Sequence, residues 1–514
     1  MKDNKRFNSI YHQVCSDAQK AYQYKQIDIC YQLIQTAAFI AYSYNQFFYD
    51  EKLESLLKRN TELLYNTNQS SIPDKTLQTT NKKVIFMDTS GLDNRGLTQQ
   101  YIRALIALNY SFLYIYIDGQ TNGSTNNPKT IEEIKKYPKA KIAVFSKNTK
   151  YSHKIKKITQ IIQEYNPESV LLHLMPWDVV SLSVIHQLKH IKSYNINLTD
   201  EAFWLGASFI DYNIEFRNYG YTISLEQRKL KQEQLLYLPY YPIIPSNQKD
   251  FQGFPPNIPT DKLKILTGGN FYKILDKKNS FFKLMDAILQ ANINSIILIA
   301  GHGNLKELYK RIQMMSNKDR VFYIGIRKDI NEVFKQSDIY LSTYPISGAL
   351  MAQYAAINAK PIIAYTEEKL IDNKLEEVIC HKLHPQISFY DFDSTIQYSK
   401  YLCNNEETRN KEGLLLQKAI TTENEFNHGL NQILEKAPLT ILKQDKIDYK
   451  YIAQIYLSLR KDSFKDIIIL LFKVYKSRFI LKFPFLMLYI PTCIVQKIQN
   501  LIKNIYKHLK RRIN

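Results

Sequence analysis

The chain has 514 residues, of which 45% are hydrophobic, with charged residues interspersed among them. This composition excludes a disordered protein, and the length is too great for one ordinary hydrophobic core, so we expect two α/β domains with appended segments. The formal net charge of +21 would suit nucleic-acid binding, but the sequence contains no nucleic-acid-binding motif, so we expect no nucleic-acid partner. Five scattered cysteines without paired or metal-ligand spacing predict reduced thiols in the cytoplasm.

The N-terminal part, residues 1–65, is expected to be helical. Its tyrosines and phenylalanines recur in stripes that suit a protein core. The basic N-terminus is followed by no uninterrupted apolar run, so we expect no signal peptide. A polar linker is expected over residues 66–83.

A first α/β domain is expected over residues 82–238. Apolar runs predict strands at residues 82–88, 112–117, 141–145, 170–174 and 193–198. Strands that alternate with helices are typical of a parallel, Rossmann-like sheet, which binds ligands outside the carboxyl ends of its strands. Arg95 and Gly96, in the loop after the first strand, are therefore acceptor-side candidates. His173, at a later strand end, is either a secondary candidate for a general base or a structural histidine.

Residues 197–206 read Asn-Leu-Thr-Asp-Glu-Ala-Phe-Trp-Leu-Gly and contain our first candidate for catalysis. The segment resembles one in bacterial glycosyltransferases that usually reads Asn-His-Ala-Asp-His-x-Phe-Trp-Leu-Gly, with Leu198 and Glu201 in place of the two histidines. This resemblance implies that Asp200 and Trp204 face the acceptor. Asp200 is either the base that takes a proton from an acceptor hydroxyl or the N-cap of a helix that begins near Glu201.

Arg217 lies shortly after this segment. It is a further acceptor-side candidate, which either orients sugar hydroxyls or pairs with Glu215.

A second α/β domain is expected over residues 263–440, after a linker over residues 239–262 that contains six prolines. Strand-like runs occur at residues 264–269, 295–300, 320–325, 339–343 and 361–365. The first two run into the glycines Gly268, Gly269 and Gly301. Turns without side chains can let phosphate oxygens approach the backbone, so these glycines are donor-binding candidates.

The order of these elements resembles the donor-binding domain of GT-B glycosyltransferases. Residues 270–274, Asn-Phe-Tyr-Lys-Ile, resemble a loop of O-GlcNAc transferase-like enzymes in which a lysine meets the nucleotide diphosphate. The resemblance implies that Lys273 binds diphosphate together with Ser347 and Gly348, which open a helix whose N-terminus favours anions. It also implies that the segment with Arg327 contacts the base, commonly uracil. We therefore expect a GT-B fold and a UDP-sugar co-substrate, with no bound cofactor.

Several family features differ in this chain. Tyr354 occupies the position at which many GT-B enzymes carry an acid that grips the ribose. Ile346 and Tyr354 stand where many retaining enzymes have paired glutamates, whereas Glu368 and Glu376 have the right spacing but lie beyond the strand. These differences favour an inverting mechanism. We expect no metal, because Lys273, backbone N–H groups and a helix N-terminus can neutralise the leaving diphosphate.

Residues 441–514 are expected to form C-terminal helices that end in a membrane-interfacial tail. After Asp466 the chain has ten basic and no acidic residues. The apolar run between Lys482 and Lys497 would be about 21 Å long as a helix, short of the hydrocarbon core of about 30 Å. We expect this tail to lie on an anionic membrane surface. The alternative is a helical subdomain that packs on the protein and exposes a basic face.

Together these features predict a glycosyltransferase that moves a hexosyl group from a nucleotide diphosphate sugar to a glycan acceptor. Because of the tail, we expect a lipid-linked acceptor, as in bacterial capsule or lipopolysaccharide biosynthesis, and a cytoplasmic protein peripheral to the inner face of the membrane. The alternatives are a sugar-nucleotide 2-epimerase of the same fold, a protein glycosyltransferase, and a non-catalytic membrane-bound scaffold.

Overall fold

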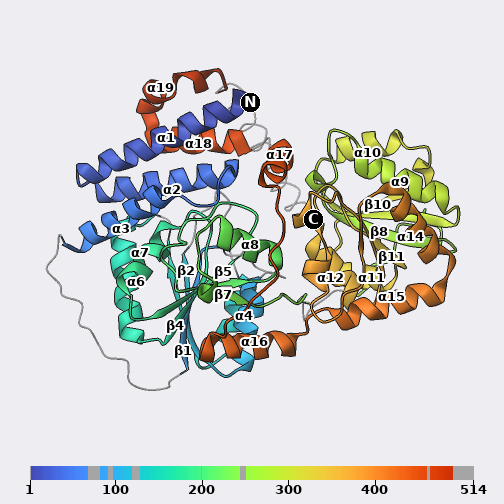
Figure 1. The fold of residues 1–514 in the computed structure, drawn as a ribbon, viewed down its shortest axis with the longest axis horizontal. Coiled ribbons are helices and arrows are strands. Elements are labelled where there is room, and N and C mark those ends of the chain that lie inside the picture. Colours follow the sequence, from blue (N-terminus) through green and yellow to red (C-terminus); the bar gives the residue numbers. More distant parts are fainter. Residues whose placement is uncertain are drawn as a thin grey trace, which may run out of the picture.

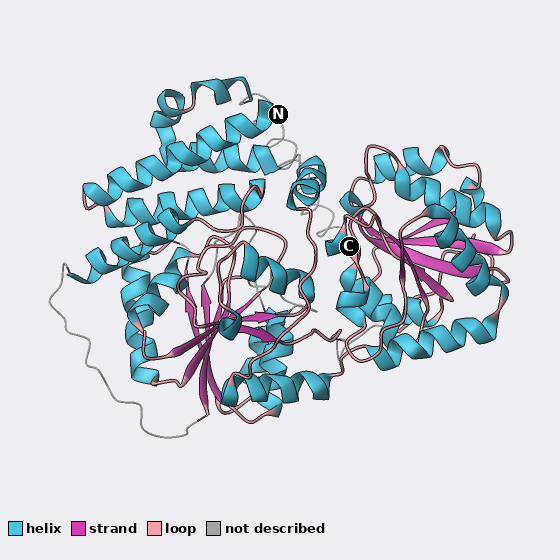
Figure 2. Cartoon of the chain, in the orientation of Figure 1, coloured by secondary structure: helices cyan, strands magenta, loops and turns pink. Residues whose placement is uncertain are grey.

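The computed structural model describes residues 2–66, 82–90, 97–117, 128–146, 148–197, 199–243, 250–459 and 463–489. Two parallel sheets lie side by side with helices packed around them, and a layer of N- and C-terminal helices lies over the first sheet (Figure 1). The cartoon in Figure 2 separates this helical layer from the two sets of strands. This architecture confirms the α/β fold with two Rossmann-like domains that the sequence predicts.

The first sheet has seven described strands, all parallel, in the order β3-β2-β1-β4-β5-β6-β7. They are β1 (Lys83–Asp88), β2 (Ser111–Ile117), β3 (Ala140–Phe145), β4 (Ser169–His173), β5 (Lys192–Ile196), β6 (Tyr212–Glu215) and β7 (Leu235–Tyr237). The helices between them are α4 (Leu97–Ala107), α5 (Pro128–Lys135), α6 (Tyr151–Tyr165), α7 (Val179–Gln187) and α8 (Asn218–Glu226). The strand order reverses between β1 and β4, which is where sheets of this type bind ligands.

The second sheet has six described strands, also parallel, in the order β10-β9-β8-β11-β12-β13. They are β8 (Leu263–Asn270), β9 (Ser295–His302), β10 (Val321–Gly325), β11 (Ile339–Leu341), β12 (Ile362–Tyr365) and β13 (Ser388–Phe389). Its helices are α9 (Ser280–Ala291), α10 (Leu305–Gln313), α11 (Ile330–Lys335), α12 (Ala349–Ile357), α13 (Glu376–Ile379), α14 (Phe392–Asn404) and α15 (Glu406–Ala419). Its switch point lies between β8 and β11.

The strands form where the sequence has continuous apolar runs. In β1, the side chains of Val84, Ile85, Phe86 and Met87 are at most 1% exposed. Because the connecting helices cover both faces of a parallel sheet, successive residues are buried whichever face they point to.

The N-terminal helices are built onto the first domain. They are α1 (Lys2–Gln23), α2 (Ile27–Tyr44) and α3 (Glu51–Asn66). Ile34 of α2 and Leu57 of α3 share one hydrophobic core with Ile158 of α6 and Val180 of α7. The first domain therefore has an additional helical layer on one side of its sheet (Figure 1).

Helix α16 (Glu423–Lys436) lies with the first domain and not with the second. Its residues Phe426, Leu430 and Ile433 are buried in the core that also contains Tyr101 of α4. The boundary at residue 440 expected from the sequence is therefore too late, because the apolar face of α16 finds its partner on α4. The chain returns to the first domain after α15 (Figure 1).

The C-terminal helices begin with α17 (Tyr449–Leu459), whose Ile452 is buried in the core that contains α9 of the second domain. The elements that follow it pack on the N-terminal helices: α18 (Ser463–Tyr475), η5 (Lys476–Arg478), α19 (Phe479–Lys482) and η6 (Pro484–Tyr489). Ile467, Ile468 and Leu471 are buried in the core that contains α2. Asp17 of α1 accepts hydrogen bonds from Tyr475 Oη at 2.9 Å and Lys482 Nζ at 2.6 Å. Residues 490–514, the rest of the expected interfacial tail, lie outside the described residues.

Candidate active site between the two domains

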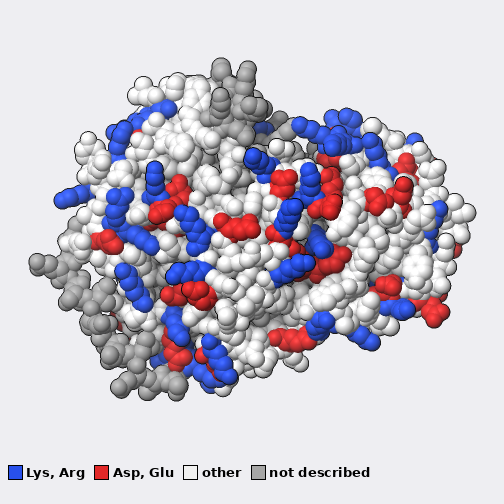
Figure 3. All heavy atoms as spheres, viewed as in Figure 1, with Lys and Arg blue, Asp and Glu red and all other residues white. Residues whose placement is uncertain are grey.

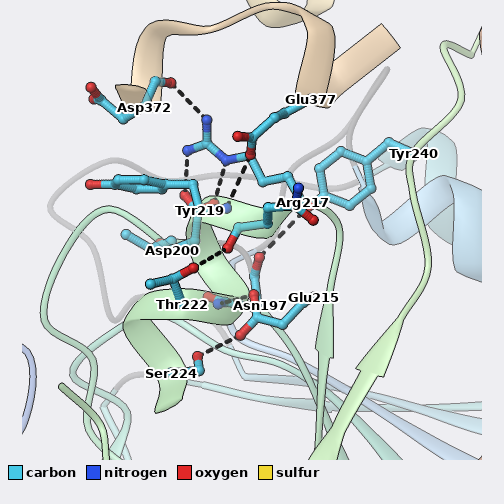
Figure 4. A network of polar contacts seen from close by, with 12 residues as sticks. Asn197, Asp200, Glu215, Arg217, Tyr219, Thr222, Ser224, Tyr240, Asp372 and Glu377 are labelled. Carbon is cyan, nitrogen blue, oxygen red and sulfur yellow. Dashed lines mark hydrogen bonds and ion pairs between the residues drawn. The ribbon is translucent and has the colours of Figure 1, made fainter. Parts of the chain in front are cut away.

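The loops that follow strand carboxyl ends in both sheets meet at the domain boundary. Arg217, just after β6, donates from Nη1 to the carbonyl oxygen of Asp372, in the loop after β12, at 2.7 Å. The backbone N–H of Tyr219 donates to Glu377 of α13 at 3.0 Å. Figure 4 shows these contacts between the domains. The site is therefore built from the strand ends that the sequence predicts as the binding edges.

Asp200 and Arg217 form a buried ion pair with two hydrogen bonds. Arg217 Nε lies 2.5 Å from Asp200 Oδ2, and Nη2 lies 2.7 Å from Oδ1. The side chains are 2% exposed for Asp200 and 10% exposed for Arg217. This two-point geometry fixes the orientation of the carboxylate. Arg217 thus pairs with Asp200, and the expected alternative of a pair with Glu215 is wrong.

Helices α2 and α3 hold the loop that carries Asp200. The Asn45 side chain donates to the carbonyl of Glu201 at 2.7 Å and accepts the N–H of Phe203 at 3.1 Å. The carboxylate of Glu54 accepts three successive backbone N–H groups, from Gly206 to Ser208. Burial raises the pKa of Glu54, and these hydrogen bonds oppose that shift. The N-terminal helices therefore fix the position of the candidate base.

Arg228 of the first domain also supports this loop, through hydrogen bonds to its backbone. Its Nη2 donates to the carbonyl oxygens of Asp200 at 2.9 Å and Ala202 at 2.8 Å. The guanidinium lies 5.0 Å from the ring centre of Trp204, which is only 6% exposed. Trp204 is thus placed under the loop, where it packs against a cation. Trp204 therefore does not face an acceptor directly, contrary to the expectation from the resemblance. It supports the loop that carries Asp200.

Glu215 is a fully buried acid beside the pair (Figure 4). Its carboxyl group accepts hydrogen bonds from Asn197 Nδ2 at 2.8 Å, Asn213 Nδ2 at 2.5 Å and Ser224 Oγ at 2.5 Å. Burial raises the pKa of Glu215 to about 7, against the opposing effect of the Ser224 hydrogen bond. Glu215 therefore changes charge near neutral pH next to Asp200.

His173 lies at the switch point of the first sheet, at the end of β4. Its Nδ1 is 3.2 Å from Asp88 Oδ1 and 3.0 Å from Thr98 Oγ1. Asp88, at the end of β1, also accepts the hydroxyl of Tyr114 at 2.7 Å. The sequence analysis missed Asp88, although an acid at the end of a buried apolar strand was a usable signal. The other two acceptor-side candidates of this region, Arg95 and Gly96, lie outside the described residues.

The donor-side glycines separate into two kinds. A Cβ at Gly268 would lie 1.8 Å from the carbonyl oxygen of Ala300, and one at Gly301 would lie 1.9 Å from that of Gly269. These two glycines allow β8 and β9 to pair closely at their ends. Gly269, at a φ of +133°, has no atom within 4 Å of an added Cβ, so its open face is the one a ligand can approach.

Lys273 lies against the turn that precedes α12. It belongs to η2 (Phe271–Lys273), directly after β8, and its Nζ donates to the carbonyl of Ser347 at 2.8 Å. Gly348 is the residue before the first turn of α12. Burial lowers the pKa of Lys273, and the charge of Glu201 in the first domain opposes this shift. The structure thus brings together Lys273, Ser347 and Gly348, and it places them close to the loop of Asp200.

The side chain of Arg327 is hydrogen-bonded within the second domain and to the linker that precedes it. Its guanidinium bonds both oxygens of Asp329, at 2.8 and 2.5 Å, and donates to the carbonyl of Gly253 at 2.7 Å. Contact of this segment with a base would therefore fall to its backbone. Tyr354 is 1% exposed and donates its hydroxyl to the carbonyl of Ile243 at 2.7 Å. A buried tyrosine thus fills the position at which the sequence resemblance implies a ribose-binding acid.

The acidic residues do not gather into a metal site in the part of the chain that the structure describes. Among the described residues, no group of three or more histidines, cysteines and acids gathers closely enough to bind a metal ion. Asp391 and Asp393 have the D-x-D spacing, but Asp391 caps α14 by accepting the N–H of Ser394 at 2.7 Å. Their position indicates a helix start.

Comparisons with known proteins identify the fold. No protein-family model and no curated protein matches this sequence. An O-GlcNAc transferase from Thermobaculum terrenum has a similar structure over 83% of this chain and 78% of that chain, with a TM-score of 0.50 and 9% identity. The lipopolysaccharide outer core galactosyltransferase WaaB matches over 69% of this chain and all of that chain, with a TM-score of 0.47 and 10% identity. A putative UDP-N-acetylglucosamine 2-epimerase from Listeria monocytogenes covers 71% of this chain and 99% of its own, with a TM-score of 0.45 and 13% identity. The first of these similarities confirms the GT-B fold.

Proposed function

We propose that this protein is a glycosyltransferase that moves a hexosyl group from a UDP-sugar to a glycan acceptor. The observation that carries the proposal is the position of Lys273. In a GT-B fold, it lies against the Ser347–Gly348 turn and close to the loop of Asp200. A cation and a helix N-terminus thus face a buried acid across the domain boundary.

The donor half of the site suits a diphosphate. Lys273 Nζ, now bonded to one carbonyl oxygen, carries further N–H groups that a diphosphate can accept. Ala349 and Leu350, in the first turn of α12, are exposed, so their free N–H groups are accessible to the same anion. Partial burial of Lys273 strengthens its contact, because little water screens it. In our proposal these groups neutralise the leaving diphosphate without a metal ion.

The acceptor half of the site offers two bases. When the acceptor hydroxyl attacks the anomeric carbon, its proton passes to a base as the bond to the diphosphate breaks. Asp200 is our first candidate, and it can act when Arg217 releases one of its two carboxylate oxygens. His173 is the second, with Asp88 in contact with Nδ1 so that Nε2 is left to take the proton. Either base on the face opposite the leaving group would give inversion.

The acceptor is proposed to be lipid-linked, as in surface polysaccharide biosynthesis at the inner face of a cell membrane. The support comes from the exposed face of the tail. Phe472, Ile480 and Leu481 are 53%, 51% and 83% exposed, and the nearby Lys473, Lys476 and Arg478 are exposed as well. Apolar side chains among cations suit the interface of an anionic leaflet. None of the described helices is both long and apolar enough to cross a membrane.

The test is a transfer assay with purified protein, radiolabelled UDP-sugars and a bacterial lipid extract. A glycosyltransferase incorporates label into the lipid fraction only when the extract is present, and it hydrolyses the donor slowly without it. A 2-epimerase converts the nucleotide sugar without any acceptor, and that outcome would replace our proposal. Label in protein instead of lipid would identify a protein glycosyltransferase.

A further inference from the structure

A hollow of about 770 Å³ lies between the second domain and the start of α17. One wall is the loop after β12, residues 366–374, and the other is residues 446–450, at the entry to α17. Tyr390, after β13, also lines the hollow. Figure 3 shows charged side chains gathered along the boundary between the domains on the face in view.

Four lysines line this hollow: Lys369, Lys374, Lys446 and Lys450. Within the described part of the chain, none of their ammonium groups has a hydrogen bond or an ion pair. Three acids also line the hollow, and two of them hold neutral hydrogen-bond donors. Glu367 accepts the hydroxyl of Tyr344 at 2.5 Å and that of Tyr451, and Asp448 accepts the N–H of Tyr451 at 3.1 Å. Glu368 is the remaining acid. Four lysines against three carboxylates leave the hollow with an excess of positive charge.

The rest of the lining is apolar or aromatic. Leu370, Ile371 and Ile447 contribute aliphatic surface, and Tyr390 and Tyr449 contribute rings. A purely ionic ligand would leave this surface uncovered. The lining therefore suits an anion that carries an apolar group.

The hollow is close to the donor turn but separate from it. Asn373, on the loop that forms one wall, accepts the N–H of Ser347, so one loop divides the hollow from the turn. A second hollow of about 630 Å³ shares Lys374 and Tyr390 with the first and extends to Arg217, the partner of Asp200. Its lining includes His384, Gln386 and Ser388, which can hydrogen-bond sugar hydroxyls. A ligand with a phosphorylated apolar end and a polar end would fit the two hollows in order.

We propose that the hollow binds a phosphate or diphosphate ester with an apolar group, held by Lys369, Lys374, Lys446 and Lys450. If the ester is the lipid-linked acceptor, an assignment that rests on the proposed function, its diphosphate lies here and its sugars point toward Arg217. Binding itself requires no transferase activity. A free phosphorylated metabolite is the other source of the same chemistry.

The proposal is tested by calorimetry with two probes, geranyl diphosphate and inorganic pyrophosphate. The variants are Lys446→Ala/Lys450→Ala and a matched control, Lys400→Ala/Lys411→Ala, which removes two exposed lysines from α14 and α15. Lys273→Ala reports binding at the donor turn. We expect the first double variant to weaken binding by about tenfold for each lysine removed and the control to stay close to wild type, while Lys273→Ala removes only the part of the binding that belongs to the donor turn.

The two probes distinguish the sources. Tighter binding of geranyl diphosphate than of pyrophosphate would indicate a lipid-linked ligand, and equal binding would indicate a free phosphate ester. Absence of binding by both probes, or binding that is lost in Lys273→Ala and kept in Lys446→Ala/Lys450→Ala, would overturn the proposal. UDP binding, measured separately, reports the donor site, so failure of the proposed function would be seen independently.

Discussion

Arg217 grips Asp200 through two hydrogen bonds, and its third nitrogen reaches the carbonyl of Asp372 on the other domain. One guanidinium thus sets both the orientation of the candidate base and a contact between the domains. Because both partners are nearly buried, we expect the pair to matter for stability and, under the proposed function, for catalysis.

Removal of the arginine is expected to destabilise the protein strongly. Arg217→Ala leaves the carboxylate of Asp200 buried and unpaired, which costs about 3–5 kcal/mol in the free energy of unfolding. The double variant Arg217→Ala/Asp200→Asn should recover part of this loss, because no unpaired charge is left. Urea denaturation measures both. An unchanged unfolding midpoint in Arg217→Ala would contradict the structural role of the pair.

The two candidate bases can be separated by single substitutions. Asp200→Asn and His173→Gln keep the size of each side chain, and loss of the true general base should lower kcat by about 10²–10⁴-fold. Binding of UDP should change little in either variant, because neither residue lies at the donor turn. Steady-state transfer kinetics measure kcat, and calorimetry measures the binding of UDP. Full activity in both variants would exclude both residues as the base.

The raised pKa of Glu215 should make the free energy of unfolding depend on pH. Its pKa is raised to about 7 in the folded protein, from 4.5 for an ordinary glutamate, so the folded state holds its proton more tightly than the unfolded state. The resulting stabilisation is present in full below pH 4.5 and is lost as the pH rises through 7, by about 3 kcal/mol in total. Glu215→Gln cannot titrate, so the fall in stability between pH 5 and pH 8 should become smaller. An identical fall in wild type and variant would show that Glu215 is not its source.

Because the tail exposes apolar side chains among cations, we expect the protein to bind anionic vesicles. Leu481→Glu replaces an 83% exposed apolar side chain with a negative one, so sedimentation with phosphatidylglycerol vesicles should decrease while thermal stability is kept. Leu439→Glu is the matched control, since Leu439 is 62% exposed outside the tail. Equal sedimentation of the two variants would remove the support for a membrane-bound acceptor.

Much of the fold could be predicted because buried parallel strands leave continuous apolar runs in the sequence. The runs at residues 82–88 and 295–300 correspond to β1 and β9. The short strands β6, β7 and β13, of four, three and two residues, were not predicted, since so few residues give little apolar pattern. The packing of α16 on the first domain was not predicted either. Its amphipathic pattern indicates that one face is buried but not which domain covers that face.

The candidate site was predictable in part. Lys273 and Ser347 both follow strand ends of one sheet, so their proximity follows from the topology. The pairing of Asp200 with Arg217 depends on how the loops after β5 and β6 fold, which the strand pattern leaves open. The contact between Asp88 and His173 could have been inferred, since β1 and β4 are neighbours at the switch point.

Calorimetric titration with UDP and UDP-sugars tests the central claim most directly. We expect wild-type protein to bind at one site and Lys273→Ala to bind about 10- to 100-fold more weakly, because it loses charge-assisted hydrogen bonds to the diphosphate. Lys273→Arg, which keeps the charge, should retain part of the affinity. A wild-type protein that binds no nucleotide diphosphate would contradict the account and favour a membrane-bound scaffold of the same fold.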